Sequence, residues 1–466
     1  MEILDQLKDA EARLLIVDDA FAKMLPALVG QLPSMTDVLH AGDGPLPTGL
    51  LSYEGLVAEG PAVEDAGIGG DEVYGLFYTG GTTAASKGVM LTHDNIVLNA
   101  YNRQTVFAVE REVYLHAAPM FHLADSANTF AVTLFGGTHA FIPAFDVTKT
   151  LEAIQAYRIT STVLVPTMIN AVVNSPQIGG YDLSSLRSIL YGASPIAPTL
   201  MEQALKTLGC ELVQGYGMTE TAPLLTVLPA QDHVVGGDER SARRLRSAGL
   251  PLPNIDLRIL DPEDRPVPRG AVGEICARGP VVMRSYWRKP EATAEALRGG
   301  FMHTGDLGYM DGDGYVYLVD RAKDMIVSGG ENVYSVEVEA ALYAHPAVLE
   351  AAVFGIPHTE WGEQVHAVVV LKGGADDPSR RADRALPPPH RRVQVPEDTA
   401  APPRAATQER GGQNPEAPAA GGVLGRAGAA SPLRRTVTIS LRTSEAPLWR
   451  AISRALRGSG SRCYAS

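Results

Sequence analysis

Short apolar runs alternate with helix-like stretches along most of the chain. Three runs of strand length are Leu14–Val17 (LLIV), Ser161–Pro166 (STVLVP) and Ala367–Leu371 (AVVVL), and Val147–Arg158 (VTKTLEAIQAYR) is typical of a helix. Strand-length runs that alternate with helices are typical of βα units. The pattern therefore predicts an α/β architecture, and we find no internal repeat in it.

The alternation stops abruptly at Gly374. Residues 374–466 are rich in Pro, Ala, Gly and Arg and have no apolar periodicity. They contain 15 Arg, no Lys and 8 Asp or Glu, a charge of +7, whereas residues 1–373 contain 25 Lys or Arg and 45 Asp or Glu, a charge of −20. Segments of such composition bury too little apolar surface to fold. We expect this tail to be either a genuine disordered segment or the product of a reading-frame shift in GC-rich DNA.

The overall composition excludes several classes of protein. The chain has 466 residues, 45% of them hydrophobic, and a net charge of −13. Cys210, Cys276 and Cys463 are far apart and lack metal-ligand spacing, so a disulfide framework is excluded and a reducing compartment is favoured. No apolar run is long enough for a transmembrane segment, and the charged start is unlike a signal peptide. We expect a cytoplasmic protein that binds no nucleic acid.

A loop of small and hydroxylated residues follows Tyr78, where the chain reads YTGGTTAASKGVMLTH. Small residues let backbone N–H groups close around an anion, hydroxyls add donors, and a lysine adds positive charge. The flanking residues of the lysine exclude the mononucleotide P-loop pattern. The motif indicates a phosphate cradle, with a flexible hairpin loop as the alternative. Its candidate residues are Thr79, Gly80, Gly81, Thr82, Thr83 and Lys87.

A second motif, QGYGMTETAP, begins at Gln214 after a strand-like run. A carboxylate between threonines is a natural ligand for Mg²⁺, so Glu220 is a candidate metal ligand, with an ordinary solvated loop carboxylate as the alternative. Tyr216 offers a ring that could face a flat base. Upstream, YGASPIAP (Tyr191–Pro198) is another strand end that turns into a loop. Ligands of open α/β sheets bind outside such carboxyl ends.

A third motif runs from His303 to Glu339 and begins HTGDLGYMDGDGYVYLVDRAKD. Asp306 is a candidate acceptor for the hydroxyls of a sugar diol. The segment MDGDGYVYL predicts a tight hairpin, in which Asp311 and Asp313 form the turn; too few ligand positions remain for a calcium loop. Arg321 and Lys323, in the segment DRAKD, are also candidate site residues; the alternative is that they belong to an ordinary solvated charge run.

Taken together, these motifs resemble those of a known family. YTGGTTAASKGV, YGASPIAP, QGYGMTE, GEICARGP, HTGDLGYMDGDGY and DRAKDMIVSGGENVYSVEVE occur in the order found in the adenylate-forming superfamily. The segment SGGENVYSVEVE, together with APMFH (Ala118–His122), is most similar to acyl-CoA synthetases of the fatty-acid-CoA ligase and aryl-acid-CoA ligase type. The resemblance implies an α/β fold with a large, multi-subdomain adenylation domain over residues 1–320 that lacks its usual N-terminal part. Residues 321–373 would begin a small, incomplete α+β C-terminal domain, before the tail at 374–466.

The resemblance also implies a reaction. A carboxylic acid, most simply a medium- or long-chain fatty acid, would react with ATP and Mg²⁺ to give acyl-AMP, and coenzyme A would then displace AMP. The catalytic residues would be Thr219 at the α-phosphate, Glu220 at Mg²⁺ and Lys323 as the hinge of the small domain. The other residues that the resemblance assigns are Thr79–Thr83 and Lys87 for the β and γ phosphates, Gly192, Ala193, Ser194, Gly215 and Tyr216 for adenine, Asp306 and Arg321 for ribose, His122 for the acyl pocket, and Gly329 and Gly330 for the pantetheine of CoA.

The chain departs from the family pattern in two places that matter for activity. The phosphate loop has Gly80, Ala84 and Ser86 where the family usually reads TSGTTGxPKG. The family also has a C-terminal lysine, in a PxxxxGK context, that contacts the α-phosphate during adenylation, whereas no lysine follows Lys372 here. The resemblance therefore predicts a ligase that is impaired in adenylation. Two alternatives stay open: an inactive nucleotide- or acyl-binding relative, and an enzyme that adenylates an amino or aryl acid for a carrier protein.

Overall fold

The computed structural model describes residues 2–79, 86–194, 196–321, 324–328, 331–343, 348–358, 362–371 and 436–441. The chain divides into two compact units, Met1–Met325 and Ile326–Ser466. Several residues singled out from the sequence lie outside the described ranges: Gly80, Gly81, Thr82, Thr83, Lys323, Gly329, Gly330 and most of the tail. No helix in the described part of the chain has the length and apolar character needed to cross a membrane.

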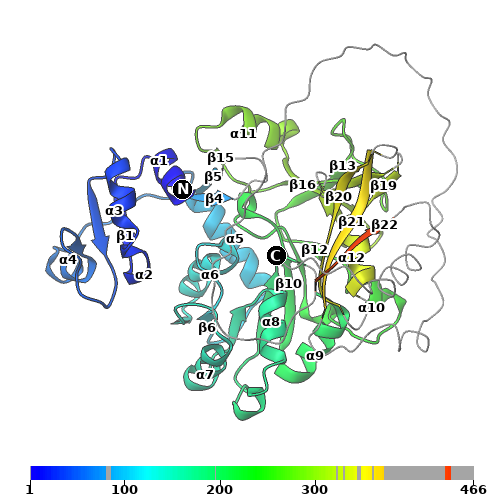
Figure 1. The fold of residues 1–466 in the computed structure, drawn as a ribbon, viewed down its shortest axis with the longest axis horizontal. Coiled ribbons are helices and arrows are strands. Elements are labelled where there is room, and N and C mark those ends of the chain that lie inside the picture. The colour runs from blue at the N-terminus through cyan, green and yellow to red at the C-terminus, as the bar shows by residue number, and fades with distance from the viewer. Residues whose placement is uncertain are drawn as a thin grey trace. The chain divides into compact units, whose positions relative to one another are not determined.

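A seven-stranded sheet forms the centre of the first unit and lies in the cyan and green part of Figure 1. Its strand order is β12-β11-β10-β9-β8-β6-β7, in which β7, β6, β8, β9 and β10 are parallel and β11 pairs antiparallel with both β10 and β12. The strands are β6 (Val113–His116), β7 (Thr138–Phe141), β8 (Ser161–Val163), β9 (Ser188–Gly192), β10 (Glu211–Tyr216), β11 (Thr226–Leu228) and β12 (Leu250–Pro251).

Helices cover both faces of this sheet, because successive apolar residues of its strands point to opposite sides. Leu115, Ile189 and Leu212 pack with residues of α7, α8 and α9 in one buried cluster. Their neighbours in sequence, Tyr114, Leu190 and Val213, pack with Phe107 after α5 and Val132 of α6 in another. The parallel strands are therefore held rigidly, with their carboxyl ends at one edge.

The helices begin and end at recognisable capping residues. In α5, the Thr92 side chain accepts from the Asn95 N–H (3.1 Å) and the Asn95 side chain from the Thr92 N–H (2.9 Å), which is a capping box. α9 has Pro198 at its first position and Gly209 at its end. The helices are α1 (Glu2–Asp9), α2 (Asp19–Ala22), α3 (Leu25–Leu28), α4 (Tyr53–Glu59), α5 (His93–Val106), α6 (Leu123–Leu134), α7 (Val147–Tyr157), α8 (Pro166–Val173), α9 (Pro198–Leu208), α10 (Glu239–Arg244) and α11 (Pro290–Ala296). Five 3₁₀ turns within the described residues are η1 (Val29–Gln31), η2 (Ile178–Gly180), η3 (Thr219–Thr221), η4 (Ala230–Asp232) and η5 (Arg298–Gly300).

Three smaller sheets complete the first unit. Their orders are β1-β2-β3, β15-β5-β4 and β13-β14-β16-β17. The strands are β1 (Leu14–Val17), β2 (Asp37–His40), β3 (Leu51–Ser52), β4 (Val73–Thr79), β5 (Lys87–Thr92), β13 (Asp256–Leu260), β14 (Gly273–Arg278), β15 (Ser285–Tyr286), β16 (Met302–Met310) and β17 (Val316–Arg321). The hairpin predicted for MDGDGYVYL is confirmed, because β16 and β17 pair antiparallel and the Asp311 carboxylate accepts from the N–H groups of Asp313 and Tyr315 (both 2.9 Å).

The second unit contains one helix, α12 (Ser335–Tyr343), and one antiparallel sheet among its described residues. The strands are β18 (Ile326–Ser328), β19 (Glu331–Val333), β20 (Val348–His358), β21 (Gly362–Leu371) and β22 (Thr436–Leu441). Val338 and Leu342 of α12 pack on Val365, Ala367 and Val369 of β21. β22 lies within the predicted tail at 374–466 and pairs with β21. The rest of that tail, residues 374–435 and 442–466, lies outside the described ranges, so its disorder stays a prediction.

Candidate functional site

The carboxyl ends of β9 and β10 meet in a close contact between two glycines. Gly192 and Gly215 are register partners in the parallel pair. A Cβ added at Gly192 would lie 2.4 Å from the Gly215 carbonyl oxygen, and one added at Gly215 would lie 2.6 Å from Leu224 Cδ2. Gly192 therefore requires glycine, because the blocking atom belongs to the backbone, whereas at Gly215 the Leu224 side chain would have to move. Directly after Gly192, Ala193 has φ +66°, and Ala193 and Ser194 are exposed at this edge of the sheet.

The turn that follows β10 carries the candidate metal ligand. Thr219 and Glu220 lie in η3, where Thr219 is half-buried and Glu220 is only 5% exposed. The Tyr286 hydroxyl donates a hydrogen bond to Glu220 Oε1 (2.8 Å). Burial, and next the nearby Glu220 carboxylate, raise the pKa of Tyr286. The alternative that Glu220 is an ordinary solvated carboxylate is therefore wrong, because the side chain is buried and held by a specific donor.

The candidate phosphate-binding lysine reaches the same tyrosine. Thr79 ends β4 and Lys87 begins β5, and the two are register partners on either side of the glycine-rich loop. Lys87 Nζ lies 4.8 Å from the centre of the Tyr286 ring, a cation–π distance. Tyr286 reaches this position because β15 pairs with β5. The ring thus brings a cation of the phosphate loop and the carboxylate of η3 to one place.

A second cluster joins three residues that the resemblance assigned to adenine and ribose. The Tyr216 hydroxyl at the end of β10 donates to Asp306 Oδ2 (2.8 Å). Arg321 pairs with Asp306 across β16 and β17, and its Nε lies 3.4 Å from Asp306 Oδ1. Burial first, and then the Asp306 carboxylate, raise the pKa of Tyr216 well above its usual value. Arg321 is largely exposed, as its predicted role at a ligand requires.

His122, the candidate residue of the acyl pocket, lies at the start of α6. It is the exposed N-cap residue of α6, and its ring contacts that of Phe121, with centroids 4.5 Å apart. Its carbonyl oxygen accepts a hydrogen bond from the Ser126 hydroxyl (3.3 Å). In the following helix, Leu123, Ala131 and Val132 are buried, so part of this apolar segment belongs to the core.

Sequence reasoning missed Tyr286. The residue lies 66 positions from its hydrogen-bond partner Glu220, in the short segment SYW, which has no motif character of its own. Only the antiparallel pairing of β15 with β5 reveals its role. A buried tyrosine hydroxyl usually has a hydrogen-bond partner, but the sequence does not say which residue that partner is.

The chemistry of these groups suits a magnesium nucleotide. Glu220 and the neighbouring Thr219 hydroxyl are oxygen donors, the kind that Mg²⁺ prefers, so the residues present fit such an ion. Lys87 supplies positive charge for phosphates, and Asp306 supplies acceptors for hydroxyls. The glycine contact between β9 and β10 lies at the carboxyl edge of the sheet, where ligands of open α/β sheets bind.

Comparison with known proteins identifies related sequences over most of the chain. The family described as AMP-binding enzyme matches residues 1–287, and the family described as AMP-binding enzyme C-terminal domain matches residues 337–394. Feruloyl-CoA synthase from an Amycolatopsis species is 45% identical over 314 residues, which cover 67% of this chain and 62% of that protein. The chain thus spans less than two thirds of the length of this relative.

Two further proteins extend the comparison. Medium/long-chain-fatty-acid–CoA ligase FadD8 from Mycobacterium tuberculosis is 38% identical over 391 residues, covering 81% of this chain and 66% of FadD8. The crystal structure of ATP-bound MatB from Rhodopseudomonas palustris superimposes with a TM-score of 0.68 and 34% identity, covering 79% of this chain and 71% of MatB.

Proposed function

Since this chain belongs to the AMP-binding enzyme family, we propose that it is an ATP-dependent acyl-CoA ligase. A carboxylate oxygen attacks the α-phosphorus of ATP, the bond to the bridging oxygen breaks, and pyrophosphate leaves. The sulfur of coenzyme A then attacks the acyl carbonyl, and AMP leaves as the thioester forms. The observation that carries this proposal is the pair of clusters around β10, one through Tyr216 to Asp306 and one through Tyr286 to Glu220.

Each cluster has a defined part in the proposal. Asp306 and Arg321 bind the ribose hydroxyls, while Gly192, Gly215 and Tyr216 form the adenine pocket. Lys87 neutralises the β and γ phosphates, and Thr219 binds the α-phosphate. Mg²⁺, when bound at Glu220, supplies charge neutralisation for the phosphates. Because Tyr286 donates to Glu220, it keeps that carboxylate oriented in the buried turn.

The carboxylic acid substrate, the rate of adenylation and the location of the protein can be specified further. We propose a medium- or long-chain fatty acid, supported by the apolar segment after His122 and by the similarity to FadD8. The similarity to feruloyl-CoA synthase favours an aryl acid as the second candidate. We also propose that adenylation is impaired, because no lysine follows Lys372. The location we propose is the cytoplasm.

Synthetic acyl adenylates test the proposal without relying on the first half-reaction. The chain is incubated with fatty-acyl-AMP or feruloyl-AMP and CoA, and thioester is measured by mass spectrometry. We expect fatty-acyl-CoA to form faster than feruloyl-CoA. A holo carrier protein replaces CoA in a parallel assay, and transfer only to the carrier would favour the carrier-loading alternative. Tight adenylate binding with no transfer to either acceptor would favour the inactive binding protein.

A further inference from the structure

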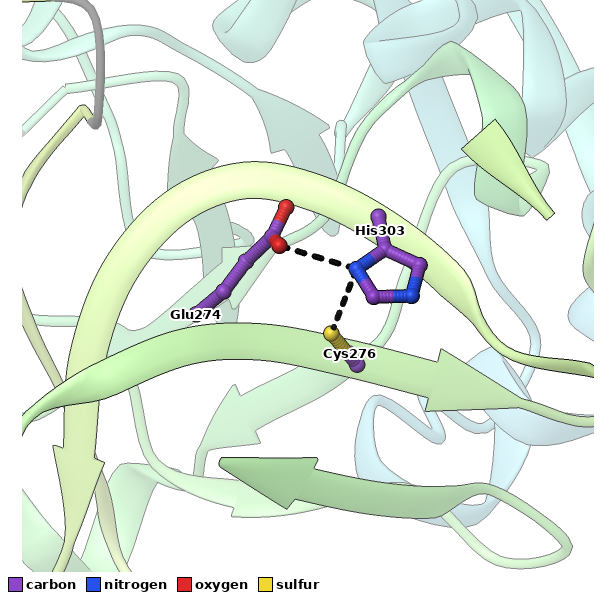
Figure 2. A group of neighbouring side chains, drawn as sticks. All are labelled: Glu274, Cys276 and His303. Carbon is purple, nitrogen blue, oxygen red and sulfur yellow. Dashed lines mark hydrogen bonds and ion pairs between the residues drawn. The ribbon is translucent and has the colours of Figure 1, made fainter. Parts of the chain in front are cut away.

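A cluster of three metal-ligating side chains lies outside the nucleotide site, on the sheet β13-β14-β16-β17. Glu274 and Cys276 come from β14 and His303 from β16, and Figure 2 shows the three side chains converging on His303 Nδ1. That nitrogen lies 2.8 Å from Glu274 Oε2 and 3.2 Å from Cys276 Sγ. One ligand atom from each residue lies within 4.8 Å of the other two. In the described part of the chain, it is the only such group of His, Cys, Asp or Glu.

The backbone of the sheet fixes this arrangement. Glu274 and Cys276 are two residues apart on one strand, so their side chains lie on the same face. Cys276 and His303 are direct register partners, and a register shift on β16 follows. Within that shift, Gly305 has φ +74° and its N–H donates to Glu274 Oε1 (3.0 Å). The ligand positions therefore depend on strand pairing rather than on mobile loops.

The hydrogen bonds of His303 do not satisfy both nitrogens of its imidazole ring. Nδ1 faces both a carboxylate and a thiol, but one nitrogen can make an optimal bond with only one of them. Nε2 is buried and has no hydrogen-bond partner among the described residues; its nearest ionic neighbour is Asp264 Oδ1 at 3.7 Å. A cation bound to Nδ1 would use its lone pair and leave the proton on Nε2, facing Asp264.

The charges around the cluster can accommodate a cation. Asp264 and Glu274 are carboxylates, and Arg298 bridges them through Nε (3.3 Å to Asp264) and a terminal nitrogen (3.0 Å to Glu274). Cys276 is fully buried and Glu274 partly exposed, so an ion would enter from the Glu274 side.

We propose that Glu274, Cys276 and His303 bind a divalent metal ion of the zinc type, with a carboxylate oxygen, a thiolate sulfur and an imidazole nitrogen as three protein ligands. Mixed sulfur, nitrogen and oxygen donors select Zn²⁺ and Co²⁺ over Mg²⁺. This site is chemically unlike Glu220, whose environment offers oxygen donors. An ion here would link β14 to β16 across the strand pair. The three cysteines alone do not predict it, because two of the ligands are other residue types.

Cobalt is the probe for the test, because a Co²⁺–thiolate bond gives a charge-transfer band in the near ultraviolet. The full chain with Cys463→Ser as background is titrated with Co²⁺, and we expect one equivalent to produce the band. Cys276→Ser should abolish it. Cys210→Ser is the matched control, since Cys210 is also a buried free thiol whose pKa burial raises to about 12. A band that survives Cys276→Ser would overturn the proposal.

A second variant tests the carboxylate ligand without removing its backbone contact. Glu274→Gln keeps an acceptor for the Gly305 N–H but loses the negative charge. Competition against a chromophoric chelator should show Zn²⁺ affinity at least about tenfold weaker in Glu274→Gln and in Cys276→Ser. Unchanged affinity in both variants, with circular dichroism showing a folded chain, would refute a metal site. These readouts need no nucleotide, so their failure would leave the proposed ligase activity untouched.

Discussion

At the scale of single residues, Asp306 connects the end of the central sheet to the candidate ribose site. It accepts from the Tyr216 hydroxyl at 2.8 Å and faces Arg321 across the hairpin. Hydrogen bonds to a charged group contribute about 1.5–3 kcal/mol. If Asp306 binds the ribose, Asp306→Asn should weaken binding of a non-hydrolysable acyl-AMP analogue about 10- to 100-fold, as measured by isothermal titration calorimetry.

Two further variants distinguish ligand binding from a local structural effect. Asp256→Asn is the control, because Asp256 also accepts from arginine side chains, Arg258 and Arg278, on the same sheet. It should leave affinity unchanged. Tyr216→Phe removes one neutral donor and should cost about 1 kcal/mol, roughly a fivefold loss. Equal affinities for Asp306→Asn and Asp256→Asn would exclude Asp306 from the ligand site.

The buried ion pair between Arg103 and Glu112 is expected to affect the free energy of unfolding rather than ligand binding. The Arg103 guanidinium donates to both oxygens of Glu112, one of them at 2.9 Å, and both side chains are almost fully buried. Removing one partner of such a pair leaves an uncompensated charge and costs about 3–5 kcal/mol. Glu112→Gln should therefore shift the urea denaturation curve strongly. Glu263→Gln, at the exposed pair with Arg265, should cost less than about 1 kcal/mol, and similar shifts for both would contradict this prediction.

At the scale of elements, the close contact between β9 and β10 limits which side chains can replace glycine at the carboxyl edge of the sheet. A Cβ at Gly192 would lie 2.4 Å from a backbone carbonyl, which cannot move without shifting β10. Gly192→Ala should cost about 1–3 kcal/mol, the usual cost of overpacking, and weaken adenylate binding. Gly179→Ala is the matched control, because nothing lies within 4 Å of a Cβ there. Thermal denaturation and calorimetry measure the two effects, and a neutral Gly192→Ala would show that the strands separate easily.

The boundaries of the helices and strands show how much of the fold the local sequence predicts. The strand expected at Leu14–Val17 is confirmed as β1, and the helix expected over Val147–Arg158 is confirmed as α7, one residue shorter. The strand expected at Ser161–Pro166 ends at Val163, because Pro166 begins α8. Proline is favoured at the first helical position, where its missing N–H costs nothing. Apolar runs alone therefore predict that an element exists but not where a strand becomes a helix.

The candidate site depends on pairings that local sequence does not encode. Glu220 follows the end of β10, as expected from the sequence. Asp306 is expected in a turn, but it lies in the middle of β16, where the pairing with β14 shifts register. The contacts that orient them come from Tyr286 and Tyr216, which lie 66 and 90 residues away from their partners. Contacts of such separation require the register of several sheets, and no periodicity within one segment specifies that register.

At the scale of the whole molecule, two kinds of bound ion are expected to act through different physics. Mg²⁺ at Glu220 would be held partly by the nucleotide phosphates, so its binding would depend on ATP. The zinc-type ion at Cys276 would be held by the protein alone and would stabilise the fold by an amount that grows with the logarithm of its affinity. Metal dependence of activity and metal dependence of stability are therefore separable in this chain.

The two proposed half-reactions should respond differently to the loss of positive charge at the phosphates. Lys87 is proposed to bind the β and γ phosphates, which acyl-AMP lacks, and the adenylation lysine of the family has no counterpart after Lys372. Loss of one preorganised charge at a transition state typically costs about 10²- to 10³-fold in rate. ATP–pyrophosphate exchange should therefore be slower by about that factor than in the Amycolatopsis feruloyl-CoA synthase assayed in parallel, each enzyme with its preferred acid. Thioester formation from synthetic acyl-AMP should be affected much less. Exchange at the rate of the relative would show that another group in this chain replaces the lysine.

Lys87→Met should weaken ATP binding while leaving acyl-AMP binding unchanged, whereas Asp306→Asn should weaken both, because both ligands carry the ribose.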